Sequence, residues 1–189
     1  MQVSKYNFVP LAFQGFSFGS IALGFCNIGL VLPQTVPQMA IGMCFASAFL
    51  GLTIGSISEI LQGNVAIGTT MGTNAGFYLA YMIMFTPSTG LLADPRDLQI
   101  AASVLSFAYG IPTFFFFIGT LKHGLWLIKL LMLEVSLAYI LSGAGNAINN
   151  STVVAAGGWF SIILGVTAWY ISFAMIFAVE DSHLKLPLF

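Results

Sequence analysis

The chain has 189 residues, of which 58% are hydrophobic and only 6% are charged, and its formal net charge is −1. A soluble domain carries about a quarter charged residues, so five basic and six acidic side chains are too few to cover a surface that faces water. The net charge gives no sign of a nucleic-acid partner, and the composition predicts an integral membrane protein that lies in the lipid bilayer.

The charged residues divide the chain into long apolar runs. No charge falls between Lys5 and Glu59, between Glu59 and Asp94, between Asp97 and Lys122, or between Glu134 and Glu180. A spanning helix needs about 20 mostly apolar residues, so each run holds one or two spans. The runs are continuous rather than alternating, which favours helices over the strands of a membrane barrel.

Turn residues separate six expected helices along the chain. Pro10 stands in the first turn of the first helix, where its missing N–H costs little, and a turn with two prolines is expected at residues 32–37. The longest polar loop passes through residues 94–97. The expected spans are residues 10–31, 38–60, 65–85, 98–118, 124–141 and 153–179. The sequence therefore predicts an all-α bundle of six transmembrane helices in a single domain, residues 1–189.

The basic residues predict the orientation of this bundle. An even number of spans puts both termini on one side, together with Lys5, Lys122 and Lys185, whereas the opposite loops hold only Arg96. Cytoplasmic loops carry the excess of lysine and arginine. Both termini are therefore expected on the cytoplasmic side.

Small residues recur at four-residue spacing in the first three expected helices. Such rows let two helix backbones approach closely in lipid. The candidate packing residues are Gly15 and Gly19, Gly51 and Gly55, and Gly68, Gly72 and Gly76. The spacing fits packing within one subunit and an interface between subunits equally well.

The sequence holds no set of residues typical of an enzyme. It contains no nucleophile–base–acid trio, and neither His123 nor His183 has a cysteine or carboxylate at metal-ligand spacing. We therefore expect no enzymatic activity, no metal and no cofactor.

Polar residues inside the expected spans are the candidates for a solute pathway. Glu134 lies near the middle of the fifth span, where a carboxylate costs several kcal/mol unless it faces water or the protein interior. Lys129, five residues away, does not stack directly on it. The candidate pathway residues are Phe16, Ser20, Asn27, Thr73, Asn74 and Glu134. Hydroxyls and amides replace the water around a small solute, and Phe16 is the candidate for an apolar constriction.

Several short motifs follow one another as in a known family of small membrane proteins. Residues 7–13 read Asn-Phe-Val-Pro-Leu-Ala-Phe, and they keep the Asn, the second Pro and the first Leu of that family's opening Asn-Pro-Ala-Pro-Leu-Gly-Leu. Further matches are Asn27 with Gly29, Glu59 with Gly63-Asn64, Gly119-Thr120-Leu121-Lys122, Gly145-Asn146, Gly157-Gly158-Trp159 and Leu186-Pro187. On these residues the chain resembles the acetate uptake transporter family, also called succinate–acetate permeases, over nearly its whole length.

The resemblance implies a homo-hexamer in which each subunit has its own pore for acetate or a similar small carboxylate. It also implies an apolar constriction, to which Phe16 corresponds, while Asn74 and Glu134 stand where the family has a tyrosine and a leucine. An ionised Glu134 would repel a carboxylate in a pore of low dielectric constant. A protonated Glu134 would donate a hydrogen bond to it and link transport to protons.

Three hypotheses about function stay open on the sequence. The first is a transporter or channel for acetate or a similar monocarboxylate. The second keeps the architecture but passes a neutral or cationic solute such as ammonia, ammonium or urea, because Asn74 and Glu134 depart from the family pattern. The third is a membrane protein that transports nothing, such as a sensor or an assembly subunit.

Overall fold

The structure is a computed structural model that describes residues 7–29, 38–86, 94–122, 125–179 and 184–188. Within these ranges every regular element is a helix, which confirms the expected all-α class. The helices are α1 (Val9–Ile28), α2 (Gln38–Met43), η1 (Cys44–Phe49), α3 (Leu50–Leu61), α4 (Val65–Phe85), α5 (Pro95–Thr120), α6 (Trp126–Ala147) and α7 (Ser151–Val179). The turn expected at residues 32–37 lies outside the described residues.

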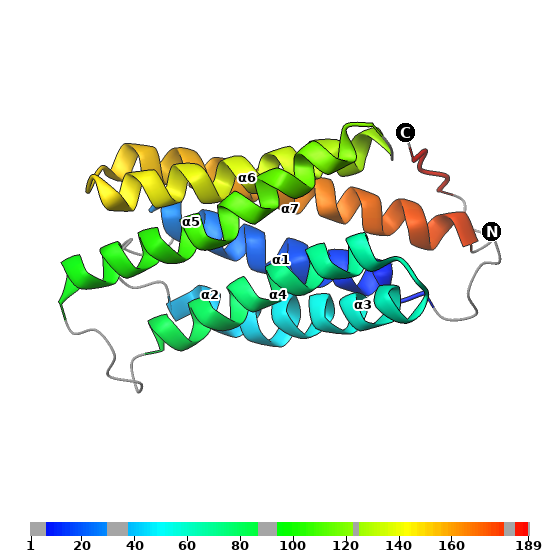
Figure 1. Cartoon of the computed structure of the whole chain (residues 1–189), viewed down its shortest axis with the longest axis horizontal. Helices are drawn as coiled ribbons and strands as arrows, with labels where there is room; N and C mark the ends of the chain where they lie inside the picture. The colour runs from blue at the N-terminus through cyan, green and yellow to red at the C-terminus, as the bar shows by residue number, and fades with distance from the viewer. Residues whose placement is uncertain (1–6, 30–37, 87–93, 123–124, 180–183, 189) are drawn as a thin grey trace.

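The helices run side by side along the length of the molecule, and α1 lies in the middle (Figure 1). Helices α2, η1 and α3 follow one another without a break, so they form one rod with a π-helical segment inside it. One side of α1 packs on α7 and the other on η1 and α3, while α5 packs mainly on α6 and only lightly on α4. The start of α1 and the end of α7 lie at the same end of the bundle (Figure 1).

Five helices of the described chain are long and apolar enough to cross a membrane. They are Val9–Ile28, Ala40–Leu61, Pro95–Thr120, Trp126–Ala147 and Ser151–Ala178. Helix α4, which is the third expected span, has 21 residues but is not one of these five. It is less apolar because its first half carries Thr69, Thr70, Thr73 and Asn74.

Helix α6 continues to Ala147, beyond the end expected at Leu141, and α7 begins at Ser151. The connection is thereby reduced to residues 148–150, and Asn149 adopts a left-handed conformation with φ 53°. The Asn150 side chain accepts hydrogen bonds from the first backbone amides of α7, at Thr152 (3.0 Å) and Val153 (3.3 Å). This is the capping geometry that starts a helix.

The backbones of α1, η1 and α3 touch along a row of small residues, here called the glycine seam (Gly15, Gly51 and Gly55). A Cβ at Gly15 would collide with the carbonyl oxygen of Ser47, and one at Gly51 would lie 3.1 Å from the carbonyl oxygen of Leu11. A Cβ at Gly55 would lie 2.5 Å from that of Ala12. The other four candidate packing glycines also contact elements of this chain: Gly19 faces Ala48 and Tyr78, Gly68 and Gly72 face Ser56, and Gly76 faces Tyr109.

Candidate functional site

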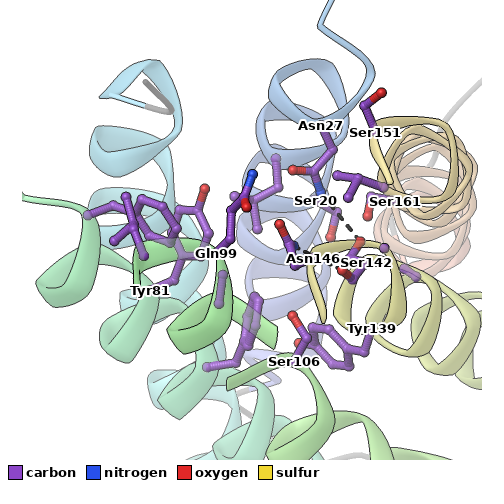
Figure 2. Close-up of a pocket in the computed structure, with 18 of the residues that line it drawn as sticks. Ser20, Asn27, Tyr81, Gln99, Ser106, Tyr139, Ser142, Asn146, Ser151 and Ser161 are labelled. Carbon is purple, nitrogen blue, oxygen red and sulfur yellow. Dashed lines mark hydrogen bonds between the residues drawn. The ribbon is translucent and has the colours of Figure 1, made fainter. Parts of the chain in front are cut away.

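A cavity of about 260 Å³ lies between α1, α4, α5, α6 and α7. It extends from the end of the bundle where α5 begins and α6 turns into α7, and it ends deep inside at Ser20, Tyr78, Ser106 and Tyr139. Figure 2 shows side chains from several helices converging on this space. The polar side chains that line it, apart from the tyrosines, are Ser20, Asn27, Gln99, Ser106, Ser142, Asn146, Asn149, Asn150, Ser151 and Ser161. Within the described chain, no charged residue lines the cavity.

Two hydrogen-bonded pairs mark the inner end of the cavity. The hydroxyls of Ser20 and Tyr78 are 2.7 Å apart and join α1 to α4. The Tyr139 hydroxyl donates to Oδ1 of Asn74 at 2.9 Å and joins α6 to α4. The Asn74 amide donates in turn to the carbonyl oxygen of Thr70 at 2.9 Å. Both tyrosines line the cavity, whereas Asn74 lies behind Tyr139.

Aromatic rings pack against these tyrosines. The ring centroids of Phe77 and Tyr139 are 4.4 Å apart, and Phe77 also meets Tyr78 edge to face at 5.4 Å. Phe16, which is only 2% exposed, packs edge to face on Tyr78 at 6.0 Å. It stands one helical turn beyond Ser20, on the side of α1 away from the cavity mouth, and does not line the cavity. Its role as a constriction stays a prediction.

Glu134 lies on α6 next to a residue that lines the cavity, Val135, but is not itself part of the lining. Its side chain is 5% exposed. Its Oε1 accepts a hydrogen bond from the Thr167 hydroxyl of α7 at 3.2 Å. Its Oε2 is the one buried side-chain oxygen or nitrogen of the described residues without a hydrogen-bond partner. The pathway role of Glu134 stays a prediction.

The structure therefore brings two of the six candidate pathway residues, Ser20 and Asn27, to the cavity wall. Thr73 does not line it, and its hydroxyl donates to the carbonyl oxygen of Thr69 at 2.9 Å. Pathway roles for Thr73 and Asn74 stay predictions.

Sequence reasoning found wall residues on α1 alone and missed those of α4, α5, α6 and α7. Gln99 and Ser106 are seven residues apart on α5 and both line the cavity. Seven residues are close to two helical turns, so they share a face. The same spacing separates Ser20 and Asn27, the two wall residues of α1 that were candidates from the sequence. Applied to the fourth expected span, it would have found the α5 wall.

Arg96 joins two helix ends at the mouth of the cavity. Its guanidinium donates to the carbonyl oxygens of Asn146 (3.0 Å) and Ala147 (2.8 Å), at the end of α6, and to Oε1 of Gln99 (3.2 Å). Its backbone amide donates to the Asp94 side chain at 2.7 Å. A cation is favourable at the C-terminal end of a helix, where carbonyl groups lack partners within the helix. Arg96 thus fixes the start of α5 against the end of α6.

Comparison with known proteins gives relatives along the full chain. It is 26% identical to acetate permease A of Emericella nidulans, over 96% of this chain and 65% of the relative. It is 25% identical to ammonia transport outward protein 2 of Saccharomyces cerevisiae, over 97% of this chain and 66% of the relative. The chain thus spans about two thirds of the length of these fungal relatives.

A solved structure of the bacterial acetate channel SatP has the same fold, with a TM-score of 0.86 and 23% sequence identity. The alignment covers 97% of this chain and 99% of that one. Residues 1–189 match the sequence model of the GPR1/FUN34/yaaH family. Together with the five apolar helices, these matches identify a multi-pass integral membrane protein. The chain belongs to the GPR1/FUN34/yaaH family.

Proposed function

We propose that the protein is a membrane transporter or channel that passes acetate or a similar small monocarboxylate through the cavity. The observation that carries this proposal is a cavity whose wall combines hydroxyl and amide groups with apolar side chains, inside an otherwise apolar helical protein. Such groups replace the water around a small solute, and ligand pockets for larger molecules usually exceed about 300 Å³. The names of the relative in Emericella nidulans and of SatP support the same solute.

The proposal includes six spans, an assembly of six subunits and both termini on the cytoplasmic side. A sixth span is supported by α4, whose 21 residues run alongside the apolar helices (Figure 1). Its polar residues suit a helix that is partly shielded from lipid by its neighbours. Exposed apolar side chains on α3, among them Ile54, Ile57 and Leu61, give the bundle a face that lipid or another subunit would cover.

Uptake of labelled acetate into liposomes that contain the purified protein tests the proposal. We expect saturable uptake above the rate of protein-free liposomes, because unassisted permeation through lipid does not saturate. The measurement is made with and without a pH gradient, which also reveals any link to protons. Uptake at the rate of protein-free liposomes under both conditions would reject the proposal.

Ammonia or ammonium is the second candidate solute. It is favoured by the absence of basic side chains from the described cavity wall and by the name of the relative in Saccharomyces cerevisiae. An ammonium pulse applied to liposomes with an internal pH indicator measures this flux. If the wild-type protein and Glu134→Gln both gave the flux of empty liposomes, this candidate would be dropped.

A further inference from the structure

The described residues that line the cavity offer a carboxylate anion no charged partner. The polar groups of its wall are neutral hydroxyls, amides and backbone groups. At the mouth, Arg96 is engaged by the end of α6, and the carboxylates of Asp94 and Asp97 stand beside it in sequence. The segments that join α1 to α2 and α4 to α5, residues 30–37 and 87–93, contain no charged residue. Among the described residues, the cavity wall also holds ionisable tyrosines, and Glu134 stands next to the wall residue Val135.

This distribution of charge distinguishes the ionised form of a small acid from its protonated, uncharged form. Moving an isolated carboxylate from water into a site of low dielectric constant costs far more than moving a neutral polar group, whose cost is offset by hydrogen bonds. Acidic neighbours make the anion still less favourable, because like charges repel. The wall therefore favours an uncharged solute.

Ser106 provides a hydroxyl that the described residues leave without a hydrogen bond. It lines the inner end of the cavity from α5 and is 7% exposed. None of the described residues makes a hydrogen bond to its hydroxyl, whereas those of Ser20 and Ser161 bond to Tyr78 and to the carbonyl oxygen of Gly157. A Cβ at Gly143, one turn from Tyr139 on α6, would lie 3.2 Å from the Cβ of Ser106. Figure 2 shows Ser106 beside Tyr139 at this end of the cavity.

We propose that the solute occupies the cavity as an uncharged molecule, the protonated acid or an isosteric amide, and that the Ser106 hydroxyl hydrogen-bonds to its polar end. This inference rests on the proposed transport function and adds the chemical form of the solute and a residue that recognises it. The hydroxyl both donates and accepts, so it pairs with the carbonyl oxygen and with the O–H or N–H group of such a solute.

Acetamide is the probe for the uncharged form, because it has the shape of acetic acid and carries no charge. Its entry into liposomes with the protein is followed by stopped-flow light scattering, with and without a membrane potential set by potassium and valinomycin. Labelled acetate is measured in parallel at alkaline pH, where a carboxylic acid with a pKa of about 4 is almost wholly ionised. We expect acetamide entry that depends on the protein and has the same rate with and without the membrane potential. We expect no accumulation of acetate driven by an inside-positive potential.

Ser106→Ala tests the contact. We expect acetamide permeability to fall about fivefold, the equivalent of one hydrogen bond of about 1 kcal/mol. Ser103→Ala is the matched control, because Ser103 is equally buried on the same helix but does not line the cavity, and it should leave permeability unchanged.

Each result separates one part of the inference from the rest. Accumulation of acetate that follows the potential would overturn the uncharged form while leaving transport intact. Equal permeability of Ser106→Ala and Ser103→Ala would overturn the contact. If acetamide entered at the rate of protein-free liposomes while acetate uptake was observed in the test of the proposed function, this inference would fall alone. If acetate uptake with and without a pH gradient also stayed at that rate, the transport function would fall with it.

Discussion

Two faces of α1 differ in how closely their neighbours pack against them. On one face, Gly15 belongs to the glycine seam, where a Cβ at Gly15 would collide with the carbonyl oxygen of Ser47. On another face, Ser20 and Asn27 line a cavity of about 260 Å³. Close packing replaces the hydrophobic effect as the force that joins helices in lipid, so the seam holds the bundle together. The same helix therefore anchors the fold on one face and lines the cavity on another.

The largest expected effect is that of Gly15→Leu, which would force the glycine seam apart. The new side chain would meet the backbone carbonyl of Ser47. A backbone group cannot rotate aside as a side chain can, so we expect the free energy of unfolding to fall by more than about 3 kcal/mol. Thermal unfolding and size-exclusion chromatography in detergent measure it. Gly42→Leu is the control, because a Cβ there meets nothing within 4 Å. Equal unfolding temperatures for the two variants would refute the role of the seam.

Tyr139→Phe removes a hydrogen bond at the inner end of the cavity. The change removes the donor to Asn74 Oδ1 and leaves a buried acceptor without its partner, which costs about 1–3 kcal/mol. Tyr170→Phe serves for comparison, since the Tyr170 hydroxyl bonds to the exposed carbonyl of Pro187 and water can replace it. Thermal unfolding of both variants decides the matter, and a smaller loss for Tyr139→Phe than for Tyr170→Phe would contradict the prediction.

Arg96→Gln loosens the mouth of the cavity. The guanidinium bonds to Asn146 and Ala147 are exposed, so water takes over part of their role and we expect a loss of about 1 kcal/mol. Lys122→Gln, at another exposed helix end, should change less. Hydrogen exchange of the backbone amides at the start of α7 reports the local effect. Exchange there that is as slow as in the wild type would show that Arg96 does not hold the mouth.

Glu134→Leu has the smallest expected effect on stability. It tests whether Glu134 contributes to a solute pathway or only to the packing of α6 on α7. Since its Oε2 has no partner among the described residues, replacing it with an apolar group of similar size should leave the unfolding temperature unchanged or raise it. A fall in solute flux at unchanged stability would assign Glu134 to the pathway. A clear loss of stability would instead reveal a structural partner that the Thr167 bond does not account for.

The sequence predicted the helical class and the membrane setting well, because both depend on composition and on the length of apolar runs. It predicted the site less completely. Ser20 and Asn27 were candidates because they are polar residues inside an apolar span. The sequence alone does not tell whether a serine such as Ser106 faces lipid, a neighbouring helix or a cavity. Only the packing of α5 on α6 distinguishes these cases.

Glu134 shows that the sequence gives the depth of a residue in a span but not the direction in which its side chain points. Its depth in the fifth expected span was evident from the apolar residues around it, but depth along a helix does not fix direction around it. Adjacent positions on a helix point about 100° apart, as follows from 3.6 residues per turn. That angle separates Val135, which lines the cavity, from Glu134, which bonds to Thr167 of α7.

The light contact between α4 and α5 shows a protein engineer where the cavity can be altered. Gln99, Ala102 and Ser106 present the α5 side of the wall, and none of them takes part in the tight backbone contacts around α1. Smaller side chains at Gln99 or Ser106 would enlarge the cavity without opening the glycine seam, and at Gln99 they would also remove the acceptor of an Arg96 hydrogen bond. The same enlargement attempted on α1 would disturb the helix on which the remaining bundle is assembled.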